Sequence, residues 1–397
     1  MTAQALDFAI PTELRSELRQ WRNRAAVVGA IGAILTAIGM VVVSPNQFYR
    51  SYLWSYIFIL GLSLGPLAWM MLQFVTGGNW GVIVRRPAEA AARTLPLVAL
   101  MFLPIVVGMN NLYPWMPVHH PVLTPHKAQY LTPTFFLARA AFYLAVWLFL
   151  GWYFNRWSAA EDRDGGLTAH RKMTFLAGPG LLLFCITVTF MSIDWLLSIQ
   201  PEWFSTMFPL LVLASQLLTS MAFLITLMVL LSFRKPMSDV LTPRHLHDLG
   251  KFLLAMVMVW GYFSYSQFLI IWAGNLPEEI PWYKVRLNNG WEAVALLLVV
   301  GHFALPFGLL LSRDVKRNFK LLASLAVFIL FMRLVDLYWQ ISPYYRAGGF
   351  GVSWMDFTAP AGLIGIWLAY FLTQLEKRTL LPPNEPTIEE VLAHGRE

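Results

Sequence analysis

Ten long apolar runs constrain this chain more than any other feature of its sequence. A helix needs about 20 apolar residues to cross the ~30 Å hydrocarbon core of a bilayer, and each run is close to that length. The runs do not alternate polar and apolar residues as the ~10-residue strands of a membrane β-barrel do. We therefore predict an all-α polytopic membrane protein with ten transmembrane helices. The predicted spans are 25–43, 52–75, 88–108, 132–157, 173–191, 204–232, 246–272, 288–312, 319–340 and 353–375.

The composition supports this interpretation and excludes several classes of protein. The 397 residues are 57% hydrophobic and only 13% charged, whereas soluble domains average roughly 45–50% apolar and about 25% charged residues. This excludes a soluble enzyme, a disordered regulator and a nucleic-acid-binding protein. The one cysteine, Cys185, offers no intrachain disulfide, no Cys-x-x-Cys-His haem attachment and no four-cysteine iron–sulfur set. The sequence also has no phosphate-binding loop of an ATPase.

The basic residues predict the topology. We assign 21 of the 29 lysines and arginines to the two termini and the even-numbered loops, 5 to the other loops and 3 to spans. Arg85 and Arg86 are assigned to the second loop. Because basic residues collect on the cytoplasmic side, both termini are predicted to be cytoplasmic, which an even number of spans also requires. The predicted parts are an N-terminal segment 1–24, a membrane domain 25–375 and a tail 376–397. The net charge of +7 then reflects topology and not an acidic ligand.

Polar and ionisable side chains within or beside the spans are the first candidates for function, because ionisable groups are expensive inside a membrane. His302 lies near the middle of the eighth span, and its ordinary pKa of about 6.5 suits proton exchange near neutrality. Arg333 and Asp336 are three residues apart, so they share a helix face and can pair. The full set of proton-path candidates is His302, Arg333, Asp336, Glu292, Asp356, Tyr262, Gln267, Glu89, Arg93 and Asp248.

The proposed path starts near Glu89, Arg93 and Asp248 on the cytoplasmic side. It passes Tyr262, Gln267 and His302 and ends near the pair Arg333–Asp336, Glu292 and Asp356 outside. The alternative is structural, because polar groups in spans also bond helices to one another at about 1 kcal/mol or less each. In that case Arg333 and Asp336 are a neutralised pair and His302 is a hydrogen-bonded core residue.

Cofactor sites are not expected in the chain itself. Of eight histidines only His302 lies at depth, so a haem held by two histidines is not predicted. His119, His120 and His126 stand among prolines in a loop, and we predict no metal site there. A quinone pocket needs an apolar cleft with a convergent polar residue. The weak candidates for one are Arg139, Asp194, Trp195 and Trp203.

Several stretches resemble one family of membrane subunits. The longest runs from His247-Asp248-Leu249-Gly250-Lys251-Phe252 through 258–262 to 266–279. It resembles the seventh-span region of ActF, the smaller NrfD-like integral membrane subunit of alternative complex III. Three shorter stretches, 77–81, 133–139 and 194–208, resemble the same family. The resemblance covers nearly the whole chain and its ten spans.

The resemblance implies a fold and a set of partners. The fold has two four-helix bundles, at about 52–193 and 204–340, with the first and last spans peripheral. The parent complex lies in the bacterial inner membrane, where it oxidises quinol and passes electrons to a periplasmic acceptor, a cytochrome c or copper protein. Haem c and iron–sulfur clusters belong to partner subunits. The implied partners are a larger NrfD-like (ActC-like) subunit, an iron–sulfur subunit, multihaem and monohaem cytochrome c subunits, small membrane subunits and lipids.

The resemblance implies an accessory role that supports proton conduction and assembly of a quinol:cytochrome c oxidoreductase. Two alternatives remain open. The chain is a quinone-binding anchor, or it is an independent secondary transporter. Transporters usually carry matched helix interruptions in two halves of the chain, and Pro96, Pro104 and Pro306 form no matched pair.

Overall fold

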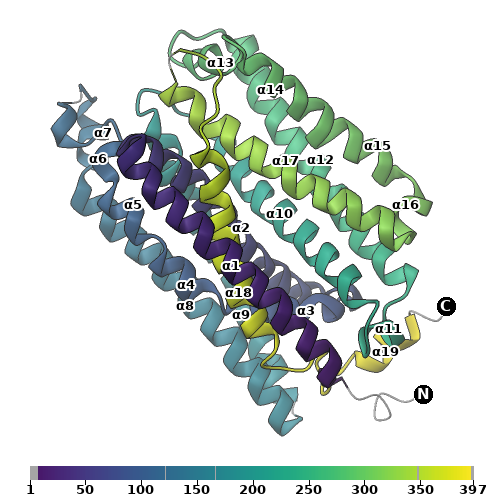
Figure 1. The fold of residues 1–397 in the computed structure, drawn as a ribbon. Helices are drawn as coiled ribbons and strands as arrows, with labels where there is room; N and C mark the ends of the chain where they lie inside the picture. The colour runs from purple at the N-terminus through teal and green to yellow at the C-terminus, as the bar shows by residue number, and fades with distance from the viewer. Residues whose placement is uncertain (1–7, 121, 166, 347, 395–397) are drawn as a thin grey trace.

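The chain folds into helices throughout. The computed structural model describes residues 8–120, 122–165, 167–346 and 348–394. It is 81% helical, with no strand among these residues. Ten of the described helical segments are long and apolar enough to cross a membrane, which confirms the all-α, ten-span prediction. Both termini lie at one end of the molecule (Figure 1), which we call the terminal side; the opposite end is the far side.

The helices follow one another with short connections. The ten spans are α1 (Thr12–Val42), α2 (Pro45–Thr76), α3 to α5 (Asn79–Ala92, Leu95–Leu100, Leu103–Val107), α8 (Pro133–Asp164), α9 (Leu167–Trp195), α10 (Met207–Leu231), α12 (Pro243–Gly274), α14 with η4 and α15 (Trp291–Leu297, Leu298–Ala304, Leu305–Leu311), α17 (Phe319–Tyr345) and α18 (Met355–Leu375). The short elements are α6 (Met109–Leu112), η2 (Pro117–His119), α7 (Pro125–Tyr130), η3 (Leu197–Ile199), α11 (Met237–Val240), α13 (Pro281–Arg286), α16 (Arg313–Arg317) and α19 (Ile388–His394).

Local sequence signals explain where the long helices begin and end. Three of them begin at a Ser-Pro or Thr-Pro pair, at Ser44, Thr132 and Thr242. The hydroxyl caps a free backbone N–H, and proline suits the first helical position because it needs no acceptor there. α2 and α8 end at Gly77 (φ +67°) and Gly165 (φ +60°), where a left-handed residue closes the last turn.

The spans form two groups of four around a central contact. α2, α3 to α5, α8 and α9 make the first bundle, and α10, α12, α14 to α15 and α17 make the second. α2 packs along α10 and joins the two bundles, as Figure 1 shows. The most apolar part of α2 is 94% buried, because other helices surround it on every side. The second bundle holds the histidine at mid-depth, as described below.

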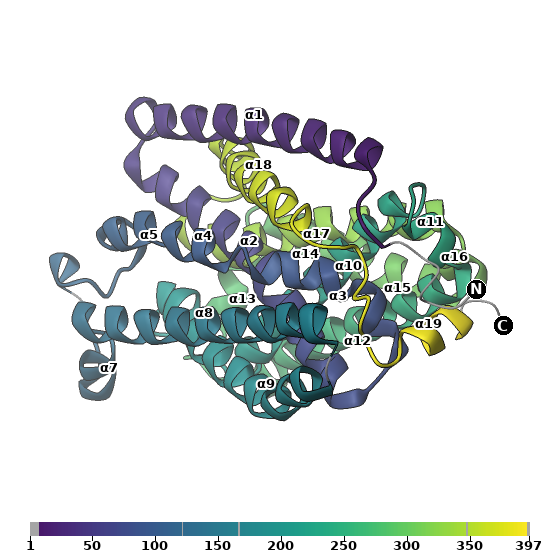
Figure 2. The same cartoon turned by 90° about the horizontal axis from the view of Figure 1, so that it is seen from below.

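α1 and α18 lie side by side outside the two bundles (Figure 2). Glycines allow this close approach, because a Cβ on Gly32 would lie 2.5 Å from the backbone nitrogen of Gly362. A Cβ on Gly365 would likewise lie 2.5 Å from the nitrogen of Gly29. Small residues facing one another are the usual way for membrane helices to pack closely. α18 in turn packs on α2 and attaches the pair to the core.

The structure corrects two predicted span boundaries. The first helix begins at Thr12 and not near residue 25, and the third begins at Asn79 and not at residue 88. Arg85 and Arg86, which we expected in a loop, therefore lie inside α3, and each is only 1% exposed. The prediction was wrong because the span was set by the apolar run alone, and the carboxylates that neutralise these arginines include distant residues, Glu161, Asp162 and Glu385.

Candidate functional site

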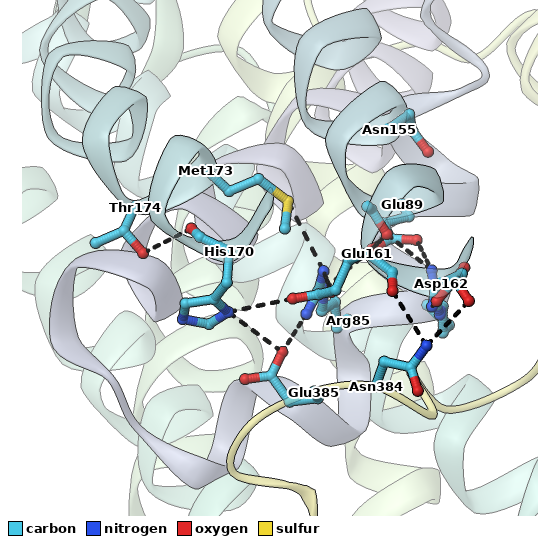
Figure 3. A network of polar contacts seen from close by, with 12 residues as sticks. Arg85, Glu89, Asn155, Glu161, Asp162, His170, Met173, Thr174, Asn384 and Glu385 are labelled. Atoms are coloured by element: carbon cyan, nitrogen blue, oxygen red, sulfur yellow. Dashed lines mark hydrogen bonds and ion pairs between the residues drawn. The ribbon is translucent and has the colours of Figure 1, made fainter. Parts of the chain in front are cut away.

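A buried ion-pair network lies at the terminal side of the first bundle (Figure 3). We call it the arginine cluster. Arg85 donates from Nε to Glu89 at 3.1 Å, and its other two nitrogens contact Glu161 and Glu385. Arg86 donates to Glu89 at 2.7 Å and also contacts Asp162. Glu89, from the same helix, thus accepts from both arginines and is fully buried.

The C-terminal tail supplies the rest of this cluster. Arg378 donates to Glu89 at 3.0 Å and to the carbonyl of Asn155 at 2.7 Å. Asn384 donates to two carbonyl oxygens at the end of α8, at 3.1 and 2.9 Å. Burial raises the pKa of the Glu385 carboxyl, and the neighbouring Arg85 opposes that rise. The tail is therefore part of the membrane domain's fold on this side.

Three groups in the arginine cluster have the composition of a metal site. His170 Nδ1 lies 3.3 Å from a Glu161 oxygen and 3.7 Å from a Glu385 oxygen, and one ligand atom from each residue lies within 4.8 Å of the other two. Arg85 already donates to both carboxylates. A cation would have to displace this guanidinium, and a buried charge without its partner is strongly destabilising. The arrangement fits a structural network better than a metal site.

Two proton-path candidates belong to this first bundle. Glu89 is held by Arg85, Arg86 and Arg378, as described above. Arg93, one turn further along, donates to Asn155 Oδ1 at 2.6 Å and to the carbonyl of Gln374 at 2.8 Å. Within the described residues, neither has a hydrogen bond to the second bundle, so the structure does not join them to His302.

A second polar group lies in the middle of the second bundle, and we call it the histidine centre. His302 is completely buried, and among the described residues neither of its ring nitrogens has a hydrogen-bond partner. Its ring meets the Trp260 ring edge-on, with centroids 4.4 Å apart. Trp260 Nε1 donates to Asp336 at 3.2 Å. Asp336 pairs with Arg333 and accepts from Gln340 at 3.0 Å. The predicted Arg333–Asp336 pair is thus present, and Trp260 contacts both Asp336 and His302.

His302 sits on an irregular turn of its helix. Residues 298–304 form the π-helical segment η4 between two α-helical pieces. Pro306 follows four residues after His302 and has no N–H to donate to the His302 carbonyl, and its ring crowds the preceding turn. A wider turn relieves this crowding, and such turns recur at functional sites. The proline was the signal in the sequence for this feature.

The histidine centre extends towards the far side through a buried arginine. Arg286, in α13, donates to the carbonyl of Gln340 at 2.7 Å and to the carbonyl of Trp282 at 3.0 Å. Its guanidinium lies 3.1 Å from the centre of the Trp282 ring. Burial lowers the pKa of Arg286. Sequence reasoning placed Arg286 in an outer loop and missed it, because its partners are carbonyl groups that no residue type reveals.

The remaining path candidates lie apart from one another. Gln267 is buried near the far side, where it donates to Tyr283 at 3.4 Å. Tyr262 is 64% exposed and points away from the bundle. Glu292 is exposed and accepts from the backbone N–H of Gly290 at 2.8 Å.

Asp356 and Asp248 are also in separate places. Asp356 begins α18 on the far side and accepts from Ser51 at 2.7 Å and from Arg346 at 2.8 Å. Asp248 pairs with Lys251 at 2.8 Å on the terminal side, beside a cavity of about 530 Å³. The structure therefore brings together His302, Arg333 and Asp336, and does not arrange all ten candidates along one continuous path.

The quinone-site candidates lie near the far side of the first bundle. Arg139 donates to both oxygens of Asp194, at 2.8 and 2.9 Å, and Tyr143 donates to the same carboxylate at 2.7 Å. Trp195 is buried and stacks on Phe102, with centroids 4.4 Å apart.

Of these four candidates only Trp203 lines the neighbouring cavity of about 380 Å³. The other walls are Lys127, Tyr130, Phe204 and mainly apolar residues. The Arg139–Asp194 pair does not line the cavity. It is connected to the cavity wall through Tyr130, whose carbonyl accepts from Arg139 at 3.1 Å.

No protein-family model matches the sequence, and no curated protein matches it significantly. The resemblance to alternative complex III subunits therefore stays a prediction. The ten apolar helices make the chain a multi-pass integral membrane protein, and any function beyond this depends on the chemistry of the groups described above.

Proposed function

We propose that this chain is a membrane subunit of a quinol:electron-acceptor oxidoreductase of the alternative complex III kind, and that His302 and Asp336 carry protons within it. The sequence stretches that resemble ActF support membership of such a complex. The proton role is supported by one observation above all. His302 has both ring nitrogens free of partners at mid-membrane depth, one indole away from a carboxylate.

The chemistry of the histidine centre suits the capture and release of a proton. A neutral imidazole has one nitrogen that donates and one that accepts, and here protein groups bond neither. The free acceptor nitrogen is available to a proton. Asp336 is a second group that can carry a proton; it accepts from Trp260 and pairs with Arg333.

Trp260 controls contact between the two groups. An indole N–H only donates, so Trp260 cannot pass a proton from His302 to Asp336. Its ring packs edge-on against the His302 ring, and its N–H donates to Asp336. Transfer then requires a side-chain movement of Trp260 or His302, and Trp260 acts as a gate. Beyond Asp336, Gln340 and Arg286 lead to the far side.

Two substitutions test the proton role in the assembled complex. His302→Leu removes both ring nitrogens, and Asp336→Asn removes the carboxylate while it keeps an oxygen that accepts from Trp260. Each is expected to slow quinol-dependent electron transfer, with Leu297→Ala on the outer surface of the same span as the control. If both variants turn over as the unaltered complex does, the proposed role of the histidine centre is wrong.

Membership is tested by the subunits that accompany the chain when it is purified from its native membrane. We expect a multihaem cytochrome c, an iron–sulfur subunit and a larger NrfD-like chain, with cytochrome absorbance in the same fraction. Isolation of the chain alone, or as a homo-oligomer, would instead favour the secondary transporter.

A quinone-binding anchor is the second candidate, and the far-side cavity of about 380 Å³ favours it. Trp203 and Tyr130 offer flat surfaces for a ring, and Lys127 offers a donor. Trp203→Ala is expected to weaken binding of a quinone analogue to the purified complex. Unchanged binding would exclude this wall from the site.

The orientation is likewise a proposal. We place the chain in a bacterial inner membrane with the terminal side in the cytoplasm, because most lysines and arginines lie on that side. A protease site added at the N-terminus should be cut in inverted vesicles and protected in intact spheroplasts; the reverse pattern would invert the topology.

A further inference from the structure

α12 presents a regular stripe of side chains on the surface that faces away from the bundle. Between residues 253 and 267, the exposed positions are Ala255, Met258, Tyr262 and Tyr265. Leu269 and Trp272 stand at the next steps of four and three residues, in a segment where Phe268 and Ile270 are exposed as well. A 3.5-residue repeat describes a helix face that packs along the length of another helix. Yet the most apolar part of α12 is only 28% buried by this chain.

The two tyrosines place hydroxyl groups deep in the membrane. Trp260 touches His302, and Gly261 lies against Phe303. His302 and Phe303 come directly after the middle residue of the 21-residue span Trp291–Leu311. Tyr262 therefore lies near the middle of the membrane, and Tyr265 lies one turn closer to the far side. Side chains on a helix lean towards its N-terminus. The Tyr262 hydroxyl therefore leans back towards the membrane centre and away from the far-side headgroups.

Neither hydroxyl is satisfied within the described part of the chain. Tyr262 is 64% exposed and Tyr265 62% exposed, and neither has a hydrogen-bond partner there. Lipid tails offer no acceptor, so a hydroxyl among them carries the cost of an unmade hydrogen bond. This cost points to a protein group that accepts from these tyrosines.

Two other membrane-facing surfaces lack exposed hydroxyl groups of this kind. The large exposed side chains of the α14–η4–α15 span are all aliphatic, and so are those of α1. They are Leu296, Leu297, Val299, Val300, Leu305, Leu309 and Leu311 on the first, and Val27, Val28, Ile31, Ile34, Leu35, Ile38, Val41 and Val42 on the second. These aliphatic surfaces can face lipid tails without leaving a polar group unpaired, whereas the α12 stripe cannot.

We infer that the α12 stripe docks a transmembrane helix of another polypeptide, whose acceptor groups bond Tyr262 and Tyr265. The stripe is bulky from Met258 onwards, so its partner needs small residues that leave room for these side chains. α1 and α18 show the same requirement inside this chain, because they meet through glycines. A second copy of this chain would set one bulky stripe against another and hold the two helices apart. The inference depends on the membrane location of the chain and not on the proposed proton role.

The direct test is a photoreactive amino acid in place of Tyr262, with Val300 as the matched control position. Val300 is exposed near the same depth on the neighbouring span. In native membranes, the reagent at Tyr262 should crosslink to a peptide inside an apolar, small-residue-rich segment of another polypeptide. The same reagent at Val300 should label lipid. A crosslink to a second copy of this chain, or to lipid alone at Tyr262, would overturn the inference.

Removal of the hydroxyls tests the hydrogen bonds separately. Tyr262→Phe and Tyr265→Phe alter no contact within this chain, so the protein should fold normally. Each loss should weaken retention of the crosslinked polypeptide in detergent by about threefold, and the double variant by about tenfold, given a typical intramembrane hydrogen bond. Val299→Ala serves as the control. If the double variant retains the partner as the unaltered protein does, the tyrosines do not bind it.

Discussion

The arginine cluster and the histidine centre are built from similar residues and differ in how fully those residues are paired. In the cluster, the carboxylates of Glu89, Glu161 and Glu385 all contact Arg85. Of the buried side-chain nitrogens and oxygens of Arg85, Arg86 and these three carboxylates, only Arg86 Nε has no hydrogen-bond partner in the described part of the chain. In the centre, the two ring nitrogens of His302, Arg333 Nε and Gln340 Oε1 have no hydrogen-bond partner in the described part of the chain.

This difference in hydrogen-bond pairing indicates two roles for buried polar groups in this protein, one structural and one functional. A fully paired network fixes the helices that contribute to it, because the loss of any member leaves an uncompensated charge. A group without partners contributes few contacts to the fold, and its nitrogens are not committed to any protein group. We therefore expect substitutions in the cluster to unfold the protein and substitutions of His302 to spare it.

The largest effect is expected for Arg85→Ala. It leaves three buried carboxylates without their shared cation, and we expect a loss of about 5 kcal/mol in the free energy of unfolding, the upper end for a broken buried pair. The measurement is denaturant unfolding in detergent micelles. Arg234→Ala, which breaks a surface pair with Glu17, should cost at most about 1 kcal/mol. Equal costs would remove the distinction between buried and surface pairs.

Asp336→Ala should come next, with a loss of about 3 kcal/mol. It leaves Arg333 buried without a carboxylate, whereas Arg85→Ala removes the cation that three carboxylates share. The same unfolding measurement applies. Asp336→Asn keeps an oxygen that accepts from Trp260 and should cost less. A cost for Asp336→Ala that exceeds that of Arg85→Ala would make the centre the more important structural network.

Trp260→Phe should have a smaller effect. It removes the indole donor to Asp336, and a hydrogen bond to a charged group contributes about 2 kcal/mol. Trp272→Phe, on the exposed side of α12, is the control and should stay within about 0.5 kcal/mol. Proton transfer in Trp260→Phe should become faster if the indole is a gate. A slower transfer would show that Trp260 is needed as part of the path.

His302→Leu should change stability least among the residues of the centre. No hydrogen bond is lost, and Leu fills a similar apolar space, so the free energy of unfolding should stay within about 1 kcal/mol of the unaltered protein. A much larger loss would show that His302 is bonded in the folded protein and plays a structural part.

The smallest effect concerns the attachment of the tail through Glu385. Its pKa is raised in the folded protein, mainly by burial, so the folded state binds more protons than the unfolded one. The stabilisation is complete below the ordinary pKa and is lost as pH rises through the raised value. Protease cleavage of the tail should therefore be faster at pH 8 than at pH 5, by less than about tenfold for each pKa unit. Glu385→Gln should remove this dependence; if cleavage instead becomes slower as pH rises, the sign of the shift is wrong.

The sequence predicted the spans well because apolar length is a local property. It also predicted the Arg333–Asp336 pair, since residues three apart share a helix face. It missed the arginine cluster because Glu161 and Glu385 lie 76 and 300 residues from Arg85. Tyr262 was wrongly grouped with the residues of the bundle interior. The sequence predicts the helix that carries it but not which face of that helix points into the bundle.

The account's central claim is that His302 carries protons and the arginine cluster does not. The most direct measurement is the number of protons moved per electron by the complex reconstituted in liposomes. We expect His302→Leu to lower this ratio while the protein stays folded, and the control Leu297→Ala, on the exposed surface of the same span, to leave the ratio unchanged. An unchanged ratio in His302→Leu would contradict the claim.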